Sequence, residues 1–251
     1  TILNTSGITW NNLTLSGGII TLLSNLSVGG LLNTGSNFTI NGTFSLTCSG
    51  GISLFGAISQ GTGTTTLNLT GGTWSTTASS GIITINTNIN GNITISGNVY
   101  YNTRTLTYLS GIITTTGSTL NITASTTFIN CDKISFATIS ITAGTTQTFN
   151  KFFSGTPTIR TRIQSSTTAN YTISFQDNFE KITKFTRISN CTVTNRGQLL
   201  CITDKSNKGG NVGVRYINQS PNGIAKNSPS TPTQTAYGIT PGVADPSFVV
   251  S

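Results

Sequence analysis

The sequence contains no histidine and no methionine, and only 7% of its 251 residues are charged. An ordinary globular protein carries roughly a quarter of charged residues. Without histidine, Ser-His-Asp triads and histidine-ligated metals are excluded. Strong helix formers are scarce, whereas Thr, Ser, Asn, Gly and Ile dominate, and these residues favour strands and turns. The composition argues against a helical bundle, a coiled coil and a doubly wound α/β enzyme.

Long hydrophobic runs are also missing. The most apolar stretch, residues 17–23, is too short and too polar beside the roughly 20 apolar residues of a membrane span. No secretory signal is visible, and we expect no membrane span. The chain starts at Thr1 and contains no Met, so we expect a fragment, a processed product or the ordered part of a longer protein.

Charge is distributed unevenly along the chain. The first 103 residues carry no charged side chain, and Arg104 stands alone before Asp132. From Asp132 onward there are twelve basic and five acidic residues, a local balance of +7. A solvated surface explains this basic half, and contact with an anionic partner such as an acidic glycan or lipopolysaccharide phosphate is the alternative. No recognition motif or basic–aromatic run accompanies the charge, so we expect no nucleic-acid partner.

Short segments of alternating apolar and polar residues fill the N-terminal region. Each segment places two apolar side chains on one face and a hydroxyl or amide on the other. Gly, Asn and Ser punctuate them, which is typical of many short strands joined by tight turns. The clearest examples are residues 13–15, 38–40, 44–46, 52–54, 67–69, 83–85, 93–95, 120–122 and 139–141.

Two all-β arrangements satisfy this pattern. In a β-solenoid, short strands stack in parallel layers; in an elongated β-sandwich array, neighbours pair antiparallel through Asn-Gly hairpins. The strands are very short and their outward residues are almost all Thr, Ser or Asn. Both features favour the solenoid, in which like residues stack into ladders.

Three regions are predicted. Residues 1–144 form a charge-poor β-repeat shaft, and residues 145–218 form a compact β-rich terminal domain, because seven aromatic residues appear there within forty positions. Residues 219–251 hold all but one of the six prolines and are predicted to be an extended segment. A longer repeat is an open alternative, since residues 3–10 resemble residues 129–136 at an offset of 126.

Four cysteines are present, and none belongs to a Cys-x-x-Cys motif. A zinc site is therefore not expected. A three-residue hairpin loop around Gly197 would set Cys191 opposite Cys201, which makes a cross-strand disulfide geometrically possible. The alternative is two buried reduced thiols that act as small apolar residues.

Catalytic chemistry has few candidate residues. Among five carboxylates, only Asp177 and Glu180 are close in sequence, and a carboxylate pair is what a polysaccharide-cleaving β-helix requires. A turn flanked by Lys181 and Lys184 explains the same residues. No phosphate-binding glycine loop follows a buried strand. We therefore expect no enzyme activity, no catalytic residue, no cofactor and no metal.

Binding candidates are aromatic or basic. Exposed aromatic rings stack on sugars, which makes Tyr100 and Tyr101 candidate glycan contacts, although adjacent strand residues face opposite ways and at most one of them lies outside. From the basic half, Lys181, Lys184 and Arg187 are candidate contacts for an anionic partner.

Residues 71–74 (Gly-Gly-Thr-Trp), 97–108 and 113–123 carry a family resemblance. They resemble the Thr/Gly/Asn-rich β-repeats of fibre-like and decoration proteins of tailed bacteriophage virions, and similar repeats of bacterial surface adhesins. The resemblance covers residues 1–144 and implies a virion-surface or extracellular protein, often a homotrimer, that projects, decorates or attaches.

Three functions follow as hypotheses. The first is a non-enzymatic virion structural protein of fibre or decoration type, whose partners are other copies of itself, other virion proteins and a host-surface glycan. The second is a secreted bacterial adhesin on the cell surface. The third is a β-helical polysaccharide-degrading enzyme.

Overall fold

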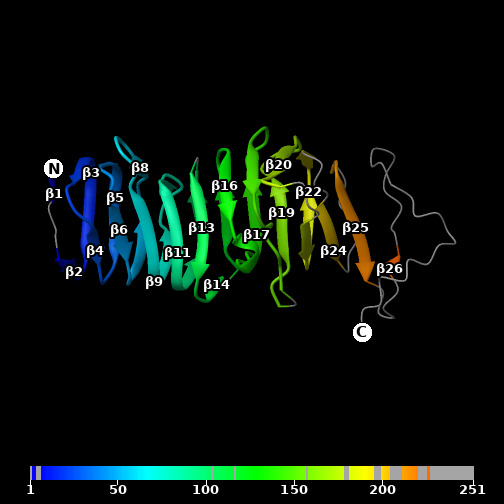
Figure 1. The fold of residues 1–251 in the computed structure, drawn as a ribbon, viewed down its shortest axis with the longest axis horizontal. Helices are drawn as coiled ribbons and strands as arrows, with labels where there is room; N and C mark the ends of the chain where they lie inside the picture. Colours follow the sequence, from blue (N-terminus) through cyan, green and yellow to red (C-terminus); the bar gives the residue numbers. More distant parts are fainter. Residues whose placement is uncertain are drawn as a thin grey trace.

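A computed structural model describes residues 2–3, 7–102, 104–115, 117–156, 158–177, 181–194, 199–203, 211–219 and 225–226. Most of the described residues lie in β-strands, and none lies in an α-helix. One 3₁₀ turn, η1, covers Cys131–Lys133. The strands stack as a parallel β-solenoid of about nine turns, seen side by side along the long axis in Figure 1. The predicted all-β solenoid is confirmed, and the antiparallel sandwich array is wrong.

Each coil turns through three faces, which we number in chain order. The parallel pairings define the first face as β2 (Thr9–Trp10), β4 (Leu26–Val28), β6 (Ser45–Cys48), the first halves of β9 (Thr66–Thr76) and β11 (Asn86–Ser96), β13 (Thr105–Ser110), β16 (Thr126–Ile129), β18 (Thr146–Phe149), β20 (Tyr171–Phe175) and β23 (Cys191–Thr194).

The second face is interrupted part-way along the solenoid. It begins with the first halves of β3 (Leu13–Leu22) and β5 (Leu32–Asn41), β7 (Gly51–Leu54), the second halves of β9 and β11, and β14 (Ile113–Thr115). After non-strand segments it resumes as a separate parallel sheet of β21 (Lys181–Lys184), β24 (Leu199–Thr203) and β25 (Val214–Gln219), with β26 (Ala225–Lys226) antiparallel to β25.

The third face, like the first, runs without interruption through the described strands. It consists of β1 (Ile2–Leu3), the second halves of β3 and β5, β8 (Ile58–Gln60), β10 (Ile82–Thr84), β12 (Asn98–Tyr101), β15 (Thr119–Ile122), β17 (Thr138–Ile141), β19 (Thr161–Ser165) and β22 (Thr186–Ser189).

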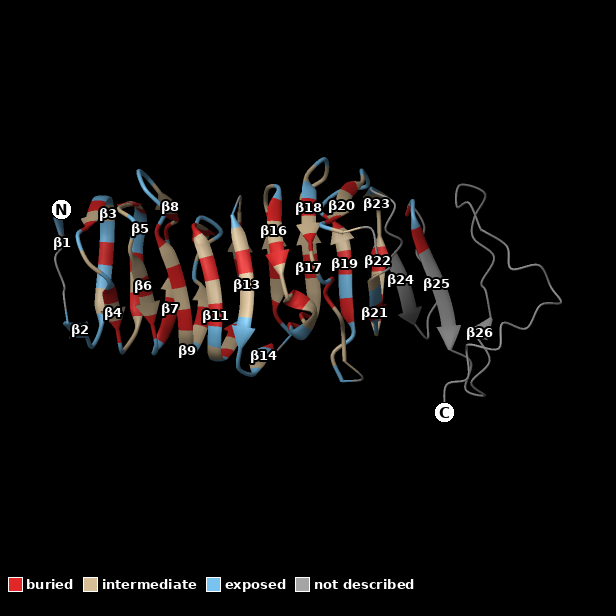
Figure 2. Ribbon diagram, viewed as in Figure 1, coloured by how far each residue is buried: buried red, intermediate tan, exposed pale blue. Residues whose placement is uncertain are grey.

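Apolar residues at every second position form the interior. Because side chains alternate across a strand and the coils are in register, like residues stack into ladders. The alternation appears as red and tan bands along the strands in Figure 2. One inward ladder of the first face runs through Leu26, Leu46, Leu67, Thr87, Leu106, Phe128, Phe149 and Phe175.

Corners are built by bulges and glycine. The long strand β11 changes face at residues 90–91, where its register with β9 shifts between Ile89 and Asn92. At another corner, a Cβ on Gly72 would lie 2.1 Å from the backbone carbon of Gly50, and Gly72 has φ +78°. Only glycine permits coils to approach so closely.

The stacking continues without a break past residue 144. Strand β18 pairs with β16 on one side and β20 on the other, and β17 pairs with β19. The described residues from 145 to 194 therefore continue the same parallel stacking, although composition changes at residue 144. The aromatic residues line the interior instead of forming a separate domain core: Phe128 stacks on Phe149 at a centroid distance of 4.9 Å, as apolar rings do in a wide coil.

The longer repeat is also wrong as a structural unit. Trp10 lies on the first face, in β2, whereas Phe136, its counterpart at an offset of 126, lies between η1 and β17, on the second-face part of its coil. Trp10 is 38% exposed and Phe136 is fully buried. The true repeat is the single coil.

The hairpin that would join Cys191 to Cys201 is absent. Strand β23 pairs in parallel with β20, and β24 pairs in parallel with β21 and β25, so the two cysteines lie in strands of different sheets. Cys191 is buried, and the side chain of Cys201 lies outside the described residues. The disulfide prediction thus loses its geometric basis. Most of the predicted extended segment, residues 219–251, also lies outside the described part.

Candidate functional site

The outer surface of the third face carries two rows of side chains, one pair from each coil. We name them the arginine row and the tyrosine row. Inward neighbours on the same strands, such as Val99, Leu120 and Ile139, are fully buried, which fixes the rows on the outside. The arginine row is Asn98, Thr119, Thr138, Arg162 and Arg187, and the tyrosine row is Tyr100, Asn121, Ser140, Gln164 and Ser189.

The two adjacent tyrosines of β12 face opposite ways, as the strand period requires. Tyr100 begins the tyrosine row and is half-buried. Tyr101 points inward and is fully buried, with its hydroxyl 2.9 Å from the carbonyl oxygen of Ile85 and 2.7 Å from that of Thr105. Burial raises the pKa of the Tyr101 phenol far above its usual value of 10.0. Tyr101 as a glycan contact is therefore wrong, and Tyr100 stays a prediction.

The basic candidates divide into two groups. Lys184 is exposed and ends β21, and Arg187 follows on the third face after a corner at Phe185, whose φ is +50°. Lys181 is different because its ammonium lies 2.7 Å from a carboxylate oxygen of Asp177. Its side chain is only 15% exposed. Lys181 is thus occupied by an ion pair, while Lys184 and Arg187 reach the surface.

Register places a further arginine beside the predicted one. Arg162 of β19 is the direct partner of Arg187 in β22, so their Cα atoms lie about 4.8 Å apart, the spacing of neighbouring strands. Arg160 is exposed two residues earlier and points to the same side as Arg162, because buried Thr161 lies between them. The sequence signal was available in the alternation Arg160-Thr161-Arg162, which predicts two outward cations at the start of one strand.

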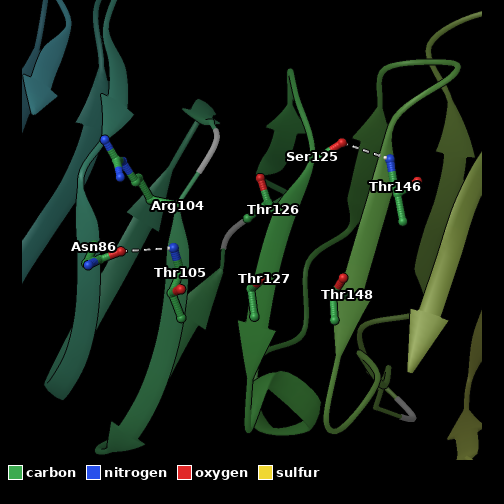
Figure 3. A pocket seen from close by; sticks show the side chains of 8 residues that line it. All are labelled: Asn86, Arg104, Thr105, Ser125, Thr126, Thr127, Thr146 and Thr148. Atoms are coloured by element: carbon green, nitrogen blue, oxygen red, sulfur yellow. Dashed lines mark hydrogen bonds between the residues drawn. The ribbon is translucent and has the colours of Figure 1, made fainter. Parts of the chain in front are cut away.

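A shallow groove lies on the first face and has a volume of about 260 Å³. Figure 3 shows Asn86 and Arg104 on one side of it and Thr146 and Thr148 on the other. Its remaining lining residues are Thr105, Ser125, Thr126 and Thr127. Side-chain oxygens hold the walls: the Thr105 amide donates to Asn86 Oδ1 at 3.3 Å and the Thr146 amide to Ser125 Oγ at 3.1 Å.

Hydroxyls and one cation define the chemistry of this groove. Arg104 is the only ionisable residue among the eight that line it. General acid–base catalysis needs a group that titrates near the working pH, and guanidinium does not. The groove is therefore equipped to hold a small polar group by hydrogen bonds and one charge.

Carboxylates in the described part of the chain are Asp132 and Asp177. Asp132 lies 3.7 Å from the Lys133 ammonium, and Asp177 pairs with Lys181. Glu180, the other half of the predicted acidic pair, lies outside the described residues. Within the described ranges, no three His, Cys, Asp or Glu side chains gather as metal ligands would, and no helix is long and apolar enough to cross a membrane.

The buried cysteines belong to the interior. Cys48 and Cys131 are both fully buried. Desolvation raises the pKa of the Cys48 thiol from 9.0 to about 12, and that of Cys131 further still. Such thiols act as small apolar residues, not as nucleophiles.

Comparison of the chain with protein-family models, curated proteins and solved structures finds no match.

Proposed function

We propose that this chain is a non-enzymatic structural protein of a tailed-phage virion that forms or decorates a fibre or surface projection. The solenoid itself is the observation that supports this function. Every coil pairs its backbone with the coils on either side, which makes a stiff rod, and the outward residues of the first 103 positions carry no charge. Such a rod is suited to projection from a particle.

Attachment is the second part of the proposal. The neutral rod gives way to a surface on which Tyr100, Arg162 and Arg187 share one face. Aromatic rings and guanidinium groups are the side chains that hold sugars and anions in extended sites. We propose a virion-surface location, with a host-surface glycan as the ligand and other copies of the chain, as a homotrimer, and other virion proteins as neighbours.

Purified particles test the assignment. Mass spectrometry of gradient-purified phage should find this chain at a fixed ratio to the tail or capsid proteins, and gold-labelled antibody should mark one projection. Recovery of the chain from bacterial cell envelopes and not from particles would favour the secreted adhesin. Release of oligosaccharides from a capsular polysaccharide by the purified chain would contradict a non-enzymatic role.

A further inference from the structure

Arg162 and Arg187 stand next to each other on adjacent coils, although nothing in the fold requires charge there. The three preceding positions of the arginine row are neutral: Asn98, Thr119 and Thr138. Like charges directly opposite one another on neighbouring strands destabilise a sheet. A threonine at either position would continue the row without that repulsion. The arginine pair therefore lowers the stability of the fold.

Among the described residues, no carboxylate is paired with Arg162 or Arg187. Within the part of the chain that the structure describes, neither guanidinium forms an ion pair or hydrogen bond. The described carboxylates, Asp132 and Asp177, lie beside Lys133 and Lys181 instead.

Two more cations border the pair. The Thr161 amide donates to the carbonyl of Phe185 at 3.1 Å, which sets Arg160 beside the corner that follows Lys184. Both Arg160 and Lys184 are exposed. Arg160 and Lys184 thus lie at or beside the corner where the second face turns into the third, next to the arginine pair, and positive charges close together raise the local potential.

We propose that this basic cluster, Arg160, Arg162, Lys184 and Arg187, binds an acidic polysaccharide through its carboxylate groups. Guanidinium matches carboxylate in a bidentate pair, and two guanidiniums on successive coils suit a ligand with repeated anions along its length. This inference rests on the proposed attachment function and names the class of its ligand.

The surroundings of the cluster fit a sugar better than a nucleic acid. Along the tyrosine row, Gln164, Ser189 and Ser140 lie next to the arginines and offer amide and hydroxyl groups, which exchange hydrogen bonds with sugar hydroxyls. Single-stranded nucleic acid binding relies on aromatic platforms. Tyr100 lies three strands from the strand of Arg162, at least about 14 Å away.

Binding of a defined oligomer tests the proposal. Isothermal titration would measure the affinity of the full chain for a polyuronate of about ten sugars, with dextran and a single-stranded DNA of equal charge as comparisons. We expect the polyuronate to bind and the dextran not to bind. The double variant R162T/R187T, which continues the threonines of the row, should lose about 10-fold or more in affinity.

The matched control is K133T/K151T, which removes the same charge from exposed lysines elsewhere. It should stay within about 3-fold of the parent chain, because surface charges at a distance are screened. Thermal melting should show R162T/R187T at least as stable as the parent, so that lost binding is not lost folding.

The proposal is overturned if the parent chain does not bind the polyuronate, if both double variants weaken binding equally, or if the DNA binds as tightly as the polyuronate. These results leave the virion assignment intact, because that assignment is tested on purified particles. Absence of the chain from particles, with polyuronate binding retained, would overturn the virion assignment alone.

Discussion

At the scale of the residue, three buried ionisable side chains make the stability of the fold depend on pH. Cys48, Cys131 and Tyr101 are fully buried, and their pKa values are raised by desolvation, that of Cys48 to about 12. Each group is neutral in the folded chain at ordinary pH. As the pH rises, the unfolded chain loses these protons first, so the folded state binds more protons and becomes less stable.

Alkaline pH should therefore destabilise the protein in a defined window. The free energy of unfolding, measured by urea denaturation, should hold steady up to about pH 8 and fall above about pH 9, by about 1.4 kcal/mol per pH unit for each buried thiol. A Cys48→Val variant should show a shallower fall than the parent. A free energy that stays constant or rises between about pH 9 and 10 would contradict the buried, neutral state of these groups.

At the scale of the element, the bends at the corners determine which face each strand joins. Asn90-Gly91 lies inside β11, where the chain bends from the first face to the second. In a sandwich the same dipeptide would close a hairpin. Close approach at such corners is possible because glycines stack: a Cβ on Gly50 would lie 2.5 Å from the backbone carbon of Gly30.

Adding a methyl group to Gly50 should lower the free energy of unfolding. The Cβ of Gly50→Ala would overlap the backbone of Gly30, which cannot move away without separating the two coils. We therefore expect a loss of about 3 kcal/mol in the free energy of unfolding. Gly144 is the control, since a Cβ there meets no atom within 4 Å and only its φ of +74° opposes alanine. Gly144→Ala should cost about 1 kcal/mol. Equal losses in urea denaturation would show that the coils are not in contact at Gly50.

Local patterns in the sequence predicted the strands, but not how they share faces. Alternation at residues 120–122 and 139–141 marks two strands correctly, and the structure pairs them on the third face. The positions of corners and bulges, as at Leu15 and Ser16, depend on contacts with the coil below and leave no fixed period. For that reason the sequence marked Arg187 as a candidate by its charge, whereas its position beside Arg162 was evident only from the register.

On the scale of the whole molecule, the change of composition at residue 144 does not interrupt the stacking of the coils. Charge and aromatic residues increase after residue 144, yet the first and third faces continue to stack strand on strand. The change reflects what fills the interior: leucines in the early coils give way to phenylalanines such as Phe128 and Phe149. One continuous stack couples neighbouring coils through their interfaces.

Because the stack is continuous, a destabilising substitution in a late coil should also lower the stability of an early coil. Phe149→Ala should cost about 3–5 kcal/mol, and it should lower the midpoint of unfolding reported by the buried Trp74 in a Trp10→Phe background. Fluorescence during urea denaturation measures this midpoint. An unchanged Trp74 transition would indicate that the regions before and after residue 144 unfold as separate domains.

Parallel, in-register stacking is the claim on which the fold and the shared third face both depend, and engineered disulfides test it most directly. Thr119 and Thr138 are partners on adjacent coils, about 4.8 Å apart, which lies within the Cα range of a disulfide. The variant T119C/T138C should therefore close a disulfide on oxidation, as mass spectrometry would detect. Asn98 and Thr138 are separated by one further coil, roughly 10 Å, so N98C/T138C should remain reduced. Closure of the second pair and not the first would contradict the register and, with it, the face that carries the arginines.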